Sequence, residues 1–227
     1  MSSPQSGGDP NGQIPLVKRI VGVRPCLYLP SSMLNDRSSI QSLLESRRSA
    51  KPRELSGPGP SAKELERMLT IAARAPDHGK LTPWRFVIVA DDQRDALAEL
   101  LRSALADANP EATDAHFQKE EEFAHYAGQL VVLVSRPVPD HKIPLWEQEL
   151  SCGAAGMNLL LAAHALGYVA GWVTGWRAYS DRVRTSLCEP GERIGGFIFI
   201  GHSVRELEDR PRPALADIAR TWKPPTS

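Results

Sequence analysis

The chain has no excess of charge of either sign, because 27 lysines and arginines balance 27 aspartates and glutamates in 227 residues. A nucleic-acid-binding domain usually presents a basic face, and attraction to an anionic membrane surface needs a similar excess. The composition therefore indicates neither class of partner. We expect a protein that binds neither nucleic acid nor a membrane.

Cysteine is also scarce. The chain has three, Cys26, Cys152 and Cys188, and they lie far apart in the sequence. An odd and sparse set is typical of a reduced, cytoplasmic protein and not of a disulfide framework. No two cysteines have the spacing of metal ligands, and the six histidines form no metal-binding pair. We expect a cytoplasmic protein without a metal site.

Long hydrophobic runs are missing as well. The longest, Gly153 to Leu166, contains Asn158 and His164, so it predicts a buried core helix rather than a membrane span. The N-terminal stretch MSSPQSGGDPNGQ is polar and rich in Gly, Pro and Ser, unlike a secretory signal. We expect residues 1–36 to form a partly disordered extension, residues 37–222 a single domain and residues 223–227 a tail.

The sequence that remains mixes helical and strand patterns with long connections. Helices are expected at 37–48, 61–75, 91–106, 111–128, 147–166 and 180–187, and strands at 84–90, 130–135, 168–175 and 196–201. Asp36 or Ser38 is a candidate cap for the first helix, and Ser61-x-x-Glu64 has the form of a capping box. Pro76 should end the second helix at Ala75. This order predicts a sheet wrapped by helices, in the α+β or α/β class.

Basic residues gather just after the first predicted helix, where Arg47, Arg48 and Ser49 are followed by Lys51. Taken alone, this group is typical of a solvated helix C-terminus, at which cations are favourable. The alternative is a phosphate clamp. The backbone at a helix C-terminus repels anions, so guanidinium groups and a hydroxyl would have to supply the binding.

A second group lies in the stretch ARAPDHGKLTPW, where Arg74 closes a helix and His78 occupies the turn after it. At neutral pH a histidine can donate a hydrogen bond to an anion or a carbonyl. A third group, Trp172 and Thr174, lies in AGWVTGW. The glycines there indicate a close approach, either by core packing or by a flat aromatic ligand. There is no P-loop, no nucleophile elbow and no dinucleotide-binding glycine motif.

In combination, these pieces resemble the FMN-dependent nitroreductase family, and its short-chain branch of NAD(P)H nitroreductases most closely. The resemblance rests on RRS at 47–49, ARAPDH at 73–78, PW at 83–84, the stretch from His141 to Gly175, and GFIFIGH at 196–202. It covers roughly residues 37–222 in order. It implies an α+β fold with a central mixed sheet flanked by helices, in an intertwined homodimer that shares two FMN molecules between its subunits.

The resemblance also assigns cofactor-binding positions. Arg47, Arg48 and Ser49 would hold FMN from one subunit, and Arg74 and His78 would reach the same flavin from the partner. Trp172, Val173 and Thr174 would line the site. Lys51 matches a lysine near the flavin ring, and Arg212 a basic residue near the phosphate. No residue is assigned a catalytic acid or base role.

The implied reaction passes hydride from NADH or NADPH through the flavin to a nitroaromatic or quinone-like acceptor. Two alternatives stay open at this point. The first is an FMN enzyme of the same fold with another chemistry, such as dehydrogenation or dehalogenation, with Ala108 to Phe123 as the substrate lid. The second is an FMN-binding protein without catalytic activity.

Overall fold

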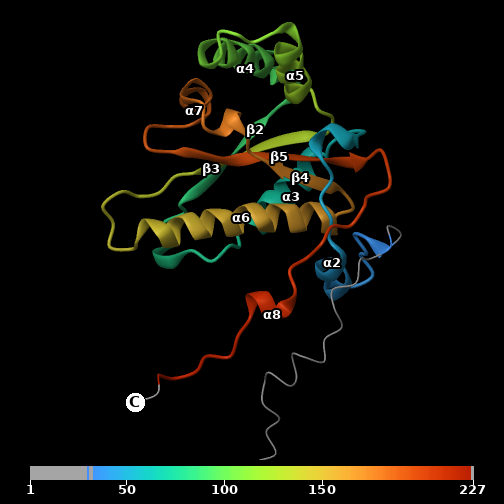
Figure 1. Cartoon of the computed structure of the whole chain (residues 1–227), viewed down its shortest axis with the longest axis vertical. Coiled ribbons are helices and arrows are strands. Elements are labelled where there is room, and N and C mark those ends of the chain that lie inside the picture. The colour runs from blue at the N-terminus through green and yellow to red at the C-terminus, as the bar shows by residue number, and fades with distance from the viewer. Residues whose placement is uncertain (1–29, 31–32, 226–227) are drawn as a thin grey trace, which may run out of the picture. The chain divides into compact units, whose positions relative to one another are not determined.

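The structure is a computed structural model that describes residue 30 and residues 33–225. Most of the extension predicted at residues 1–36 lies outside the described residues. The chain divides into two units, of which Ser31–Leu207 holds the sheet (Figure 1). Residues from Glu208 onward belong to the other unit, whose described part contains the short helix α8 (Leu215–Ile218).

The sheet is organised around its long strand β5 (Arg193–Ser203). One edge of β5 pairs with β3 (Gln129–Ser135), and β2 (Trp84–Val89) continues the sheet beyond β3. The other edge pairs with β4 (Val169–Val173) and then with β1 (Leu55–Ser56). All of these pairs, which cover the described strands, are antiparallel. The α+β fold is thus confirmed, with an antiparallel sheet in the place of the expected mixed one.

Helices cover both faces of this sheet, which explains why residues 130–134 of β3 are fully buried. Val131 and Leu133 pack with α3 (Ala62–Ala72) and α6 (Leu145–Ala165). Val132 and Val134 point to the opposite face. The helices on that side are α4 (Arg94–Ala108), α5 (Asp114–Ala124) and α7 (Asp181–Leu187) (Figure 1). None of the described helices is long and apolar enough to cross a bilayer.

The local signals at helix ends are partly confirmed. Ser61 caps α3 as predicted, with its amide donating to Glu64 at 3.0 Å. Helix α3 ends at Ala72, earlier than the predicted Ala75. Helix α2 (Ile40–Ser46) begins later than predicted and is capped by Ser39 rather than by Asp36 or Ser38. The reason is that the Asp36 carboxylate accepts bonds from the amide and hydroxyl of Ser38, which forms a turn ahead of the helix.

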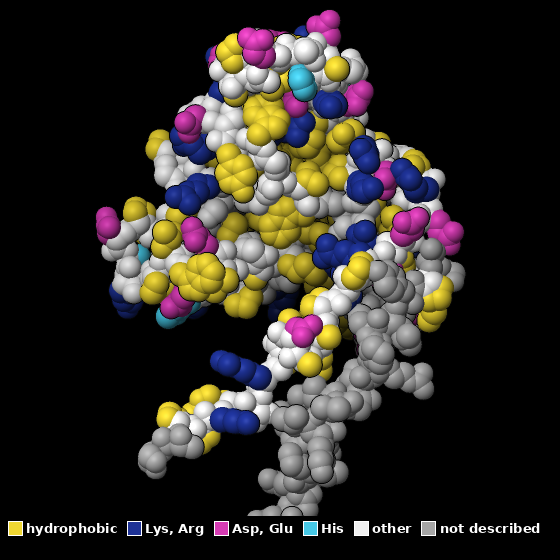
Figure 2. Space-filling view, in the orientation of Figure 1, with side chains coloured by type: hydrophobic (Ala, Val, Ile, Leu, Met, Phe, Trp, Pro, Cys, Tyr) yellow, Lys and Arg dark blue, Asp and Glu magenta, His cyan; other side chains and the backbone are white. Residues whose placement is uncertain are grey.

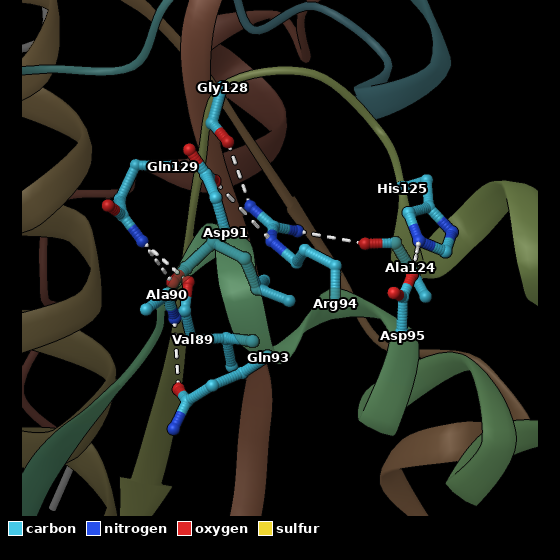
Figure 3. A network of polar contacts seen from close by, with 11 residues as sticks. Val89, Ala90, Asp91, Gln93, Arg94, Asp95, Ala124, His125, Gly128 and Gln129 are labelled. Atoms are coloured by element: carbon cyan, nitrogen blue, oxygen red, sulfur yellow. Dashed lines mark hydrogen bonds and ion pairs between the residues drawn. The ribbon is translucent and has the colours of Figure 1, made fainter.

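A buried arginine fastens the α4–α5 pair to the sheet (Figure 3). The Arg94 guanidinium donates to the carbonyl of Ala124 at 3.0 Å and to that of Gly128 at 2.8 Å. Burial lowers the pKa of Arg94 below its ordinary value. Nearby, His125 joins Asp95 at 2.9 Å. The end of α5 and the turn into β3 therefore depend on one side chain from α4.

Candidate functional site

Two of the predicted groups meet where the loop after α2 crosses β4. At Gly171, in the middle of β4, a Cβ atom would lie 2.5 Å from the carbonyl oxygen of Ala50. Only a glycine allows the two backbones to come this close. Arg47, Arg48 and Ser49, which lead into Ala50, therefore lie in a loop that packs on β4, the strand that contains Trp172.

The loop is held in shape by its own hydrogen bonds. Arg47 donates to the Ser49 hydroxyl at 3.1 Å, and the Arg48 guanidinium donates to the Ser49 carbonyl at 2.9 Å. The Asn35 side chain holds Arg48 at both backbone groups, accepting from its amide at 2.8 Å and donating to its carbonyl at 3.1 Å. Two guanidinium groups and a hydroxyl thus share one half-buried loop, a donor set suited to an anion.

Trp172 is fixed by packing. A Cβ on Gly156 of α6 would lie 2.7 Å from the indole ring, and a Cβ on Gly196 of β5 would lie 2.0 Å from its Nε1. The indole N–H donates to the Gly195 carbonyl at 3.0 Å. The Val173 side chain packs against the cluster on the opposite face, whereas Thr174 is exposed. A ligand at this strand end would meet backbone and Thr174 before it met either apolar side chain.

A buried histidine lies near this loop. His164, in the last turns of α6, is 1% exposed, and neither ring nitrogen has a hydrogen-bond partner among the described residues. Its pKa is lowered to about 4, first by burial and then by the positive charge of Arg47. The imidazole is therefore neutral at physiological pH. The contribution of Arg47, the lesser of the two causes, indicates that this cation lies near the end of α6.

Two further basic candidates, Lys51 and Arg212, each pair with a carboxylate. Lys51 is 65% exposed and pairs with Glu54 at 3.5 Å, and Arg205 contacts the same carboxylate at 2.9 Å. Arg212 belongs to the separate C-terminal unit, where it pairs with Asp209 at 3.2 Å. For both residues, a contact with a cofactor stays a prediction.

Arg74 and His78 lie at a different place in the same unit. Arg74 follows the end of α3 and is exposed. The His78 ring contacts the Glu147 carboxylate through Nδ1 at 2.7 Å, and Glu147 belongs to the first turn of α6. Glu147 and His164 are 17 residues apart in α6, which is about 25 Å along a helix axis. Within one chain, the Arg47 loop and His78 are therefore at opposite ends of α6 (Figure 1).

The turn that carries His78 is tied to the core. The Trp84 indole donates to the Ser151 hydroxyl at 3.1 Å, and this hydroxyl donates to the Pro76 carbonyl at 2.6 Å. The Asp77 carboxylate accepts from the amides of Leu81 and Thr82. Pro76, four residues beyond the end of α3, and Trp84, which opens the next strand, thus act together to fix a turn that presents basic side chains.

Three residues of this region were not identified from the sequence. Asn35 is 13 positions from Arg48, and no local sequence pattern connects the two residues. Its left-handed backbone (φ 56°) suits an asparagine. Glu147 opens one of the predicted helices, and no local signal connects it with His78. His164 was interpreted only as an interruption of an apolar run. The described residues contain no cluster of His, Cys, Asp and Glu that could hold a metal ion.

Among solved structures, the fold is similar to the nitroreductase-like family protein from Bacillus cereus, with a TM-score of 0.69 and 20% identity, covering 82% of this chain and 97% of that one. A mutant of the FMN and NADPH-dependent nitroreductase NfnB from sphigopyxis sp. strain HMH has a TM-score of 0.64 and 19% identity. The match covers 81% of this chain and 98% of that one.

Sequence relatives agree with the fold. A Haemophilus influenzae protein named "Putative NAD(P)H nitroreductase" is 34% identical over 168 residues, covering 73% of this chain and 89% of that protein. "Putative NAD(P)H nitroreductase YdjA" of Escherichia coli (strain K12) is 32% identical over 160 residues, covering 70% and 85%. Residues 44–202 match the Nitroreductase family. The chain belongs to the nitroreductase family.

Proposed function

We propose that this chain is an FMN-dependent oxidoreductase that uses NADH or NADPH to reduce nitroaromatic or quinone-like acceptors. The names of its relatives support the nicotinamide reductant, and the name of NfnB supports FMN. The observation that carries the proposal is the contact of Ala50 with Gly171. It supports the proposal because the loop that carries the Arg47–Ser49 donors packs directly on the strand that leads to the exposed Thr174.

The residues of this region fit the flavin phosphate. Arg47 and Arg48 supply charged donors and Ser49 a hydroxyl, and a dianion is the ligand that such a set favours. Burial is the main cause of the lowered pKa of His164, and the charge of Arg47 adds to it, which is a charge that a bound anion would offset. The backbone of Trp172–Thr174 and the Thr174 hydroxyl would contact the rest of the cofactor. FMN, when bound, would supply the hydride chemistry between nicotinamide and acceptor.

The site needs donors from a second copy of the chain. Arg74 and His78 are too far from Arg47 along α6 to reach the same ligand in one subunit. Between these ends, α6 exposes an apolar stripe that consists of Trp146, Leu150 and Met157, and Figure 2 shows hydrophobic side chains along this face. Burial of this stripe against a second α6 would favour a homodimer. An antiparallel arrangement would bring His78 of the second copy to the Arg47 loop.

Within that site, the protein would bind and orient rather than transfer protons. Lys51 is the candidate to stabilise negative charge on the reduced flavin ring. Lys51 is itself exposed, and its partner Glu54, at 3.5 Å, also pairs with Arg205 at 2.9 Å, so Glu54 would keep a cationic partner if Lys51 moved. We assign no general acid or base.

The visible spectrum of the purified protein tests this proposal. Flavin absorbance that bleaches under anaerobic NADPH or NADH, and returns with a quinone or a nitroaromatic, is the expected result. Flavin that neither nicotinamide can reduce would indicate a binding protein. A colourless protein that takes up no added FMN would contradict the proposal altogether.

A further inference from the structure

A buried ion pair joins α5 to the residues that directly follow the candidate site. Arg177 lies in the turn Trp176–Ala178. It is three residues beyond Thr174 in the chain. Its Nε donates to Glu120 of α5 at 2.5 Å, and its second terminal nitrogen donates to the other carboxylate oxygen at 2.7 Å. The two side chains are 15% and 5% exposed. The contact is a bidentate pair of fixed direction.

This pair is set in an apolar environment. The Arg177 guanidinium lies over the ring of Phe123, 3.9 Å from the ring centroid. Phe123 in turn packs edge-on against Phe197 and Phe199 of β5. A buried ion pair gives little net stability compared with apolar residues of similar volume, but its geometry is specific. The pair therefore contributes mainly by fixing the orientation of α5 relative to the turn.

The turn transmits this alignment to the site. Gly175 has a left-handed backbone (φ 71°) and accepts a bond from the Ala178 amide at 3.2 Å. The Tyr179 amide bonds back to Trp176 at 3.0 Å. Residues 175–179 therefore form a closed turn, so that a shift of Arg177 moves Thr174 with it.

We propose that Arg177 and Glu120 are positioning residues of the flavin site. They fix the Trp172–Thr174 segment against the cofactor and hold α5, part of the predicted lid at residues 108–123, over the acceptor. This inference rests on the proposed FMN site and goes beyond it, because neither residue belongs to the set of cofactor contacts. Loss of the pair should weaken FMN binding and change the preference between compact and bulky quinones.

The test uses the double variant Glu120→Leu/Arg177→Met, which replaces the pair by apolar side chains and should keep the fold. Arg177→Lys is a milder variant that retains the charge but loses the bidentate fork. Arg182→Met is the matched control, because Arg182 forms an exposed pair with Asp107 at 2.6 Å, away from the turn. FMN affinity is measured by flavin fluorescence on FMN-free protein, and KM is measured for a compact and a bulky quinone.

We expect FMN to bind the double variant about tenfold more weakly, with a changed ratio of the two KM values and an unaltered far-UV circular dichroism spectrum. Arg177→Lys should lie between the double variant and the wild type, and Arg182→Met should match the wild type. If the double variant fails to fold, Arg177→Lys decides alone. If the double variant and Arg177→Lys keep the FMN affinity and the KM ratio of the wild type, this inference is overturned. A wild type that binds no FMN would instead overturn the proposed function and this inference with it.

Discussion

Gly171 and Ala50 are in direct backbone contact, since a Cβ at position 171 would lie 2.5 Å from the Ala50 carbonyl oxygen. Substitution Gly171→Ala must therefore push the Arg47–Ser49 loop away from β4. We expect a loss of about 1–3 kcal/mol in the free energy of unfolding, as for other overpacked sites, and a clear loss of FMN affinity. Urea denaturation and a fluorescence titration with FMN measure the two effects.

Gly201→Ala is the control for this substitution. A Cβ at Gly201 of β5 would meet the Ser56 carbonyl at the milder distance of 3.2 Å, in a contact that does not involve the loop. Its FMN affinity should stay close to that of the wild type. Equal losses of affinity in both variants would show that general strain in the sheet, and not the loop position, controls binding.

The buried His164 should make the protein sensitive to acid. Its pKa is lowered from 6.5 to about 4 in the folded state, so between these pH values the unfolded chain binds a proton that the folded chain does not. Stability is unaffected above pH 6.5 and falls as the pH is lowered toward 4, by about 3 kcal/mol in total. Urea denaturation of FMN-free protein across this range measures the slope.

His164→Leu should remove most of this loss, whereas a leucine at the exposed His202 should not. If wild type and His164→Leu lose stability in parallel between pH 6.5 and 4, the imidazole is not held neutral in the folded protein.

Arg94→Met tests the attachment of the α4–α5 pair. The substitution removes the donor from the buried carbonyl of Ala124 and from the half-buried carbonyl of Gly128 (Figure 3). Each unsatisfied group costs about 1–3 kcal/mol, so we expect the two together to lower the free energy of unfolding by about 2–6 kcal/mol. Arg67→Met on the exposed face of α3 is the comparison and should change stability little. Similar values for the two variants would contradict this role of Arg94.

The exposed stripe on α6 predicts the oligomeric state. Leu150→Glu places a charge in the middle of the proposed contact between two α6 helices, so the variant should be monomeric and should lose its flavin. Size-exclusion chromatography with light scattering measures the mass. Ile88→Glu introduces the same charge at an exposed position of β2 and should stay dimeric. A dimeric Leu150→Glu variant that retains flavin would place the interface elsewhere.

The part of the fold that depends on neighbours in sequence could be predicted. The capping box joins Ser61 and Glu64, only three positions apart, and β3 is apolar from Leu130 to Val134, so both were visible as patterns. The start of α2 was not, because Asp36 forms its own turn with Ser38 and leaves the cap to Ser39. Several polar residues competed there for the same amides, and composition alone could not decide between them.

Contacts between distant segments lay beyond local patterns. The sequence indicated that Arg47 and His78 were candidates, but it could not show that α6 separates them. The bond between His78 and Glu147 joins residues 69 positions apart, and the bonded series from Trp84 through Ser151 to Pro76 joins three segments. Such pairings depend on tertiary packing. The resemblance to a family supplied the roles of these residues, and the structure supplied their positions.

The central claim is that one flavin site takes Arg47 from one subunit and His78 from the other. Mixing Arg47→Ala chains with His78→Ala chains, after partial unfolding and refolding together, tests it most directly. Each variant alone has two defective sites, whereas a mixed dimer has one site with both defects and one intact site. The account predicts that flavin and NAD(P)H-dependent reduction return in the mixture, to at most one site per mixed dimer. If mixed dimers are shown to form and yet no flavin binding is recovered, the shared site is contradicted.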